Sequence, residues 1–123
     1  MVRRYEDKDF EQVFEWGKSY GNTYKRELFP SVGFIVPGIA VYFLYQTDSK
    51  ICFLESMVAN PETSKEARDE ALNSITSEIL REARDRGFEV AYACSDIPAV
   101  VERAIRAGAT FKPKYVLLQK QLS

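Results

Sequence analysis

"ESMVANPETSKEARDEAL", residues 55–72, joins the end of an apolar run to a segment with helical periodicity. Pro61 ends the strand predicted over residues 51–59, because proline lacks the N–H group that a sheet ladder uses. Thr63 followed by Glu66 has the spacing of a capping box and predicts a helix start. Gly87 predicts the end of this helix. The predicted apolar face of the helix consists of Ala67, Ala71, Leu72, Ile75, Ile79 and Ala83.

The segments on either side predict a mixed α+β chain. Three runs rich in β-branched and aromatic residues precede the long helix, and turn sequences separate them, which predicts an antiparallel meander. The strands before and after the long helix are predicted to be parallel neighbours joined by a right-handed crossover. The predicted strands cover 2–5, 32–36, 39–46, 51–59, 88–94 and 114–122. The predicted helices lie between Asp9 and Gly21, over 23–28, between Thr63 and Gly87, and over 98–108.

Composition limits the possible functions. The 123 residues suit a single domain over residues 1–123, and 17 Lys and Arg against 18 Asp and Glu give no electrostatic reason to expect nucleic acid or a membrane surface as partner. The sequence has neither a long apolar span nor a secretory signal, which predicts a cytoplasmic protein. Cys52 and Cys94 lie in apolar surroundings and are predicted to be reduced core residues.

The chain contains no histidine. Nucleophilic sites of the Ser-His-Asp and Cys-His kinds are therefore excluded, as are zinc sites that use imidazole. Proton transfer would need a carboxylate, tyrosine, lysine, cysteine or water.

The order of elements resembles the GNAT superfamily of acyl-CoA-dependent N-acetyltransferases over essentially the whole chain. The stretches that carry the resemblance are "ESMVANPETSKEARDEAL", "REARDRGFEVAYACSD" and "PAVVERAIRAGATF". The resemblance implies a mostly antiparallel twisted sheet of six to seven strands, with one splayed parallel pair and helices on both faces. It implies acetyl-CoA as co-substrate. Small stand-alone proteins of this kind also occur in bacteriophage genomes, so the resemblance allows a viral origin.

The resemblance also implies where CoA would bind. The backbone of Met57, Val58 and Ala59 would align the thioester, and the start of the long helix would hold the pyrophosphate on its unpaired N–H groups. That helix start comprises Ser64, Lys65, Glu66, Ala67 and Arg68. In the family this turn usually contains two glycines. Here Ala67 and Asp69 occupy the two glycine positions. Asp69 places a carboxylate near a diphosphate, which is unfavourable unless a neighbouring cation compensates. The turn is therefore predicted to be degenerate.

Glu55 is the candidate catalytic residue. Strand alternation predicts that it shares a face with Ile51, Phe53 and Met57, so that apolar surroundings would raise its pKa. Such a carboxylate could take a proton from an attacking amine, and some members of the family use a glutamate on this strand in that way. The alternative interpretation is a glutamate at a strand edge or bulge, solvated or paired with an arginine.

The family's usual general acid is missing. The tyrosine that lies four residues before a Gly-Phe pair in much of the family corresponds to Ala104, four residues before Gly108. Tyr92, Cys94, Tyr115 or water could substitute. A structural role explains each residue better, because Tyr92 and Cys94 fit an alternating buried strand and Tyr115 begins another strand. Of the N-terminal aromatics, Tyr20 and Tyr24 are the candidates for contact with a ligand. Lys112 and Lys114 are candidates for contact with the 3'-phosphate of CoA or for a solvated turn.

Three functions remain open on sequence grounds. The first is transfer of an acetyl group from acetyl-CoA to an unidentified amine on a small molecule or a protein. The second is a catalytically degenerate binding or inhibitory protein, which would act on a host factor if the chain is viral. The third is an acyl-CoA sensor without turnover. The sequence is compatible with a monomer or a homodimer.

Overall fold

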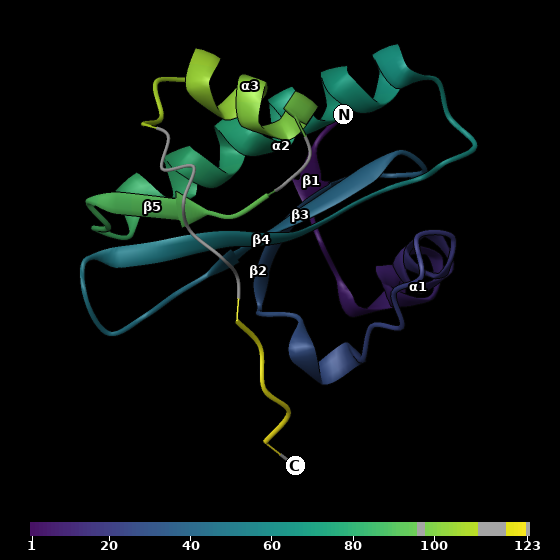
Figure 1. The fold of residues 1–123 in the computed structure, drawn as a ribbon, viewed down its shortest axis with the longest axis horizontal. Helices are drawn as coiled ribbons and strands as arrows, with labels where there is room; N and C mark the ends of the chain where they lie inside the picture. The colour runs from purple at the N-terminus through teal and green to yellow at the C-terminus, as the bar shows by residue number, and fades with distance from the viewer. Residues whose placement is uncertain (96–97, 111–117, 123) are drawn as a thin grey trace. The chain divides into compact units, whose positions relative to one another are not determined.

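Figure 1 shows the computed structural model, which describes residues 1–95, 98–110 and 118–122. The chain forms two compact units, Met1–Ala93 and Cys94–Ser123, and each is described by itself. The first unit holds a five-stranded sheet in the order β1-β2-β3-β4-β5, antiparallel except for the parallel pair β4–β5. Its strands are β1 (Arg3–Arg4), β2 (Val32–Val36), β3 (Ala40–Tyr45), β4 (Ile51–Ala59) and β5 (Val90–Ala93).

The first unit has a helix on each face of the sheet, as predicted (Figure 1). The long helix α2 (Lys65–Asp85) packs Leu72, Ile75 and Ile79 against one face. The shorter helix α1 (Phe10–Lys18) packs Val13 and Trp16 against the other face. These two apolar cores are called the α2-side core and the α1-side core below. Two short 3-10 helices, η1 (Asp7–Asp9) and η2 (Arg26–Leu28), flank α1 and the loop after it.

The start of α2 lies one residue later than the capping box predicts. Ser64 is the N-cap, and its hydroxyl accepts a hydrogen bond from the Ala67 backbone N–H at 3.1 Å. The Thr63 hydroxyl instead donates to the Asn60 carbonyl at 2.7 Å, so Thr63 closes the turn that precedes the helix. The predicted box with Glu66 is therefore wrong, although the apolar face is confirmed: its members are buried except for the half-buried Ala67.

A β-bulge in β4 changes the faces that strand alternation predicts. Phe43 on β3 pairs with Glu55 and Val41 pairs with Val58, so that Ser56 and Met57 together oppose a single residue of β3. Ser56 has a left-handed backbone with φ of 61°. Met57 packs against the α2-side core. The prediction that it shares a face with Glu55 is wrong because the extra residue shifts the alternation.

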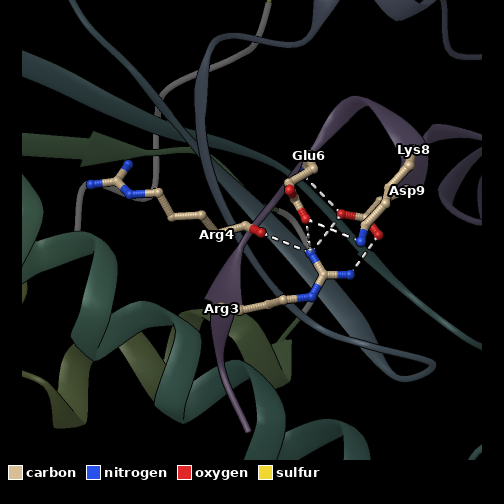
Figure 2. A network of polar contacts seen from close by, with 5 residues as sticks. All are labelled: Arg3, Arg4, Glu6, Lys8 and Asp9. Atoms are coloured by element: carbon tan, nitrogen blue, oxygen red, sulfur yellow. Dashed lines mark hydrogen bonds and ion pairs between the residues drawn. The ribbon is translucent and has the colours of Figure 1, made fainter.

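The polar network of Figure 2 fixes the entry to α1. Arg3 on β1 donates two hydrogen bonds to the Asp9 carboxylate, at 2.7 and 2.9 Å, and the Glu6 backbone N–H donates a third at 2.8 Å. Asp9 is buried with 8% of its surface exposed. These donors, first of all Arg3, lower the pKa of Asp9, while the Asp9 carboxylate raises the pKa of Arg3. A half-buried ion pair therefore ties the first strand to the start of the first helix.

The second unit contains the helix α3 (Pro98–Arg106), with Gly108 in a left-handed conformation after it, as the sequence predicts. Of the strand predicted over 114–122, residues 114–117 lie outside the described part of the chain, and residues 118–122 do not form a strand. The described residues therefore contain five strands where six to seven were predicted.

Candidate functional site

The parallel strands β4 and β5 stay together over only part of β4. Their paired residues run from Ile51 and Val90 to Leu54 and Ala93. Beyond Leu54, β4 continues from Glu55 to Ala59 while β5 has ended, and Figure 1 shows β5 beside one end of β4 only. Within the described ranges, this half of β4 has no strand partner on the side of β5. A strand edge without a neighbouring strand is where an extended ligand can add.

Glu55 lies where this open half of β4 begins. Its partner Phe43 belongs to the α1-side core, and paired residues of antiparallel strands direct their side chains to the same face. Glu55 is half-buried on that face, which it shares with Phe53 as predicted. The carboxylate is thus on the side of α1 and the following loop, whereas Met57 is on the side of α2.

The sequence interpretation missed two residues next to Glu55, which are Ser56 and Tyr45. The Tyr45 hydroxyl is 2.8 Å from the Ser56 hydroxyl and donates to the Leu28 carbonyl at 3.2 Å. Burial raises the pKa of Tyr45, the hydrogen bond with Ser56 opposes that rise, and the negative charge of Glu55 adds to it. Tyr45 therefore connects the η2 segment to the bulge and interacts electrostatically with Glu55.

Aromatic residues pack beside this group on the α1 side. The Phe29 ring stacks on Phe43 with centroids 4.4 Å apart, and Tyr24 lies 5.2 Å from Phe29. Tyr24 is half-buried, and burial raises its pKa. Tyr20 is 54% exposed, and its hydroxyl donates to the Ala59 carbonyl at 3.1 Å. Of the two predicted ligand contacts, Tyr20 lies at the open half of β4, whereas Tyr24 is part of the apolar packing.

The turn between β4 and α2 is rigidly held by Asn60. Its side chain donates to the Gly38 carbonyl at 3.0 Å and accepts from the Glu62 N–H at 2.9 Å, while its backbone N–H donates to the Ile39 carbonyl at 2.7 Å. The Arg68 guanidinium donates to the Thr63 carbonyl. Ala59 and the first turn of α2 are therefore held in a fixed relation.

The helix start keeps backbone donors for a phosphate but offers little positive charge. Ser64 accepts the N–H of Ala67, and the N–H groups of Ser64, Lys65 and Glu66 have no acceptor among the described residues. The ammonium of Lys65 pairs with the Asp69 carboxylate at 2.9 Å. The acidic residues at this end of α2 also outnumber the basic ones. Residues 62–70 carry Glu62, Glu66, Asp69 and Glu70 against Lys65 and Arg68.

Of the three side chains that are candidates for a general acid, Tyr92 and Cys94 lie within the described residues. Tyr92 on β5 pairs with Phe53, and their rings lie 5.7 Å apart. Tyr92 is 50% exposed and Cys94 is exposed, so their predicted burial is wrong, whereas Cys52 is buried as predicted. Both cysteines are free. Ala104 lies on α3 in the second unit, and Lys112, Lys114 and Tyr115 lie outside the described residues.

The residues that the structure describes contain neither a candidate metal site nor a candidate membrane span. Residues 1–95, 98–110 and 118–122 contain no group of three or more His, Cys, Asp or Glu side chains that could hold a metal ion. In the same ranges, no helix combines the length and apolar character needed to cross a membrane.

The sheet order, the single parallel pair and the helices on both faces define a GNAT-like fold. Solved structures of other proteins have the same fold. A protein from Thermus thermophilus, TTHA1254, has a TM-score of 0.75 at 12% identity and aligns over 100% of this chain and 98% of its own. Rv2747 from Mycobacterium tuberculosis, in complex with CoA and NLQ, has a TM-score of 0.73 at 14% identity over 95% of this chain and 76% of its own. An aminoglycoside acetyltransferase from an uncultured soil metagenomic sample, in complex with sisomicin, has a TM-score of 0.70 at 11% identity. It aligns over 100% of this chain and 96% of its own.

No protein-family model matches the sequence, and no curated protein matches it. The likeness is thus one of fold, shared with solved acetyltransferases at low identity.

Proposed function

We propose that this chain is an acyl-CoA-dependent N-acetyltransferase that moves an acetyl group from acetyl-CoA to an amine. The observation that carries the proposal is the position of Glu55 at the point where β5 ends and the open half of β4 begins. A carboxylate and a strand edge that has no neighbouring strand within the described ranges meet there. The acceptor is an amine on a small molecule or a protein, and the reaction takes place in the cytoplasm in a monomer or homodimer.

Each part of the site has a role in this reaction. The backbone of Met57, Val58 and Ala59 aligns the thioester along the open edge, and Ser64 to Arg68 receive the pyrophosphate. The amine nitrogen attacks the thioester carbon, Glu55 takes the proton that the nitrogen loses, and the C–S bond breaks to release the CoA thiolate. Alignment supplies most of the rate enhancement, because a thioester beside a neutral amine needs little further activation.

A second candidate is a GNAT-like binding or inhibitory protein, or an acyl-CoA sensor, without turnover. The acidic start of α2 favours it, because Lys65 is already paired with Asp69 and carboxylates outnumber cations over residues 62–70. A host factor would be the partner if the chain is viral. This candidate requires that acetyl transfer be absent.

Release of free thiol from acetyl-CoA tests the proposal. The purified chain is mixed with acetyl-CoA and a panel of primary amines: a polyamine, a lysine peptide, a peptide with a free N-terminus and an aminoglycoside. We expect amine-dependent thiol release with at least one of them, and Glu55→Gln to reduce its rate by about 10²-fold or more. Glu78→Gln is the control, because Glu78 is a carboxylate on α2 that pairs with Arg81. Equal rates for wild type and Glu55→Gln would refute the role of Glu55.

A further inference from the structure

Tyr20 makes a contact with β4 that the proposed reaction does not explain. Its hydroxyl donates to the Ala59 carbonyl at 3.1 Å, across 39 positions of sequence. The turn that carries Tyr20 is fixed by backbone hydrogen bonds from Tyr20 to Gly17, from Gly21 to Lys18 and from Asn22 to Gly17, each of 3.0 Å. Gly21 adopts φ of 81°, which a residue with a side chain rarely does. The hydroxyl is therefore held at β4 by a well-defined turn.

The Ala59 carbonyl points to the edge of β4 that β5 leaves open. Asn60 directs its backbone N–H to Ile39, in the turn before β3, at 2.7 Å. Neighbouring residues in a strand direct their backbone groups to opposite edges, so the N–H and C=O of Ala59 point away from β3. The register agrees, because Ala59 and Ala40 are directly opposite each other. Tyr20 thus occupies a backbone acceptor on the open edge.

We propose that Tyr20 is a residue of the cofactor site that competes with the pantetheine arm of CoA for the Ala59 carbonyl. This inference rests on the proposed function. An extended arm that adds to a strand edge uses its amide N–H groups as donors to the strand carbonyls. Ala59 is one of the three residues expected to align such an arm, and its carbonyl already has a donor in Tyr20. A carbonyl oxygen has two lone pairs, but the arm and Tyr20 would both approach Ala59 from the same open edge, so the arm displaces the Tyr20 hydroxyl and exchanges one hydrogen bond for another.

This exchange has a measurable consequence. A neutral hydrogen bond stabilises a folded protein by an amount that corresponds to about a two- to ten-fold change in an equilibrium constant. Tyr20→Phe keeps the ring and removes only the competing donor. The substitution therefore tightens the binding of CoA about two- to ten-fold. It leaves unchanged the binding of adenosine 3',5'-bisphosphate, which has the nucleotide end of CoA but no arm.

Calorimetric titration of wild type and Tyr20→Phe with both ligands tests the inference. Ser19→Ala is the control, because the Ser19 hydroxyl donates to the Glu15 carbonyl of α1, at 3.5 Å, and makes no hydrogen bond with β4 among the described residues. Tighter binding of CoA alone, and by Tyr20→Phe alone, supports the competition. Unchanged or weaker binding of CoA overturns it, as does an equal gain for both ligands. If none of the three proteins binds either ligand, the proposed function fails and the inference fails with it.

Discussion

Tyr45 and Ser56 join β3 to the bulge of β4 through a hydrogen bond of 2.8 Å between their hydroxyl groups. Ser56 is the one residue other than glycine with a positive φ in the described part of the chain. Such a backbone persists only where the surroundings hold it in place, and such residues concentrate at functional sites. Here it directs Glu55 to the α1 side and Met57 to the α2 side. The bulge therefore determines which face carries the candidate base.

Replacing Ser56 with valine is predicted to destabilise the fold more than replacing it with glycine. Both variants lose the hydroxyl that Tyr45 contacts, so the difference between them isolates the backbone conformation. Glycine adopts a positive φ freely and a β-branched residue does not, so we expect a difference of about 1–3 kcal/mol in the free energy of unfolding. Urea unfolding of the two variants measures it. Equal midpoints would contradict the strained bulge.

Gly33 and Gly17 are predicted to respond differently to alanine. A Cβ at Gly33 on β2 would lie 2.5 Å from the buried Phe43 ring and 3.2 Å from the Tyr42 carbonyl, so Gly33→Ala is expected to cost about 1–3 kcal/mol. A Cβ at Gly17 would lie 2.7 Å from the half-buried Tyr24 ring, which must shift, but the nearest backbone atom outside α1 lies at 3.6 Å. Alanine also favours the helix by about 1 kcal/mol, which offsets part of this cost, so Gly17→Ala is expected to cost less than Gly33→Ala. Thermal unfolding of both variants tests this order, and a larger loss for Gly17→Ala would contradict it.

The sequence predicted the β4–α2–β5 unit well, because its signals are local. The apolar spacing of Leu72, Ile75 and Ile79 and the glycine at position 87 define α2 without reference to the rest of the chain. The bulge at Ser56 has no such signal. Serine is not the residue that a positive φ favours, and the conformation depends on the pairing of β4 with β3 and on the Tyr45 hydroxyl. A prediction from alternation alone therefore places Met57 on the wrong face.

The candidate site was predictable only in part for the same reason. Glu55 and the strand edge follow from the order of elements and the family resemblance. Tyr45 contacts Leu28 and Ser56 only after the sheet and η2 have formed, and the sequence separation of these residues hides both contacts. The N-cap at Ser64 differs from the predicted Thr63 because Thr63 bonds to Asn60 within the turn. Neighbouring Ser and Thr residues both satisfy the capping pattern, and only the turn decides between them.

Asp9 is predicted to make stability depend on acid pH. Its pKa is lowered from the ordinary 3.8, chiefly by Arg3, so the stabilisation is fully present above about pH 4 and is lost as the pH falls through the lowered value. Asp9→Asn should therefore lose stability at neutral pH, by about 2 kcal/mol, and show a smaller decrease between pH 4 and pH 2. Chemical unfolding over this pH range measures both effects.

Glu11→Gln is the matched control for Asp9→Asn. The Glu11 side chain is 82% exposed in its pair with Arg26, and exposed ion pairs contribute little. An acid dependence that is the same in wild type and Asp9→Asn would contradict the assignment to Asp9.

Asp69 is predicted to weaken the binding of phosphate groups at the start of α2. In the wild-type chain the Lys65 ammonium lies 2.9 Å from the Asp69 carboxylate. Asp69→Asn removes this carboxylate and releases the ammonium. We expect the affinity for adenosine 3',5'-bisphosphate to rise several-fold, since a surface charge interaction is on the order of 1 kcal/mol. The gain should shrink at high salt, because salt screens exposed charges. Calorimetry at low and high ionic strength checks this, and an unchanged affinity at low salt would show that phosphate does not bind near Asp69.

The central claim is that the open half of β4 and the start of α2 bind acetyl-CoA, and a calorimetric titration of the purified chain with acetyl-CoA and with CoA tests it most directly. We predict saturable one-to-one binding in the micromolar range, which corresponds to a free energy of about −8 kcal/mol. No heat of binding for either ligand at millimolar concentration would contradict the claim. In that case the glycine-free turn has lost the cofactor, and the GNAT-like fold here serves to bind another protein.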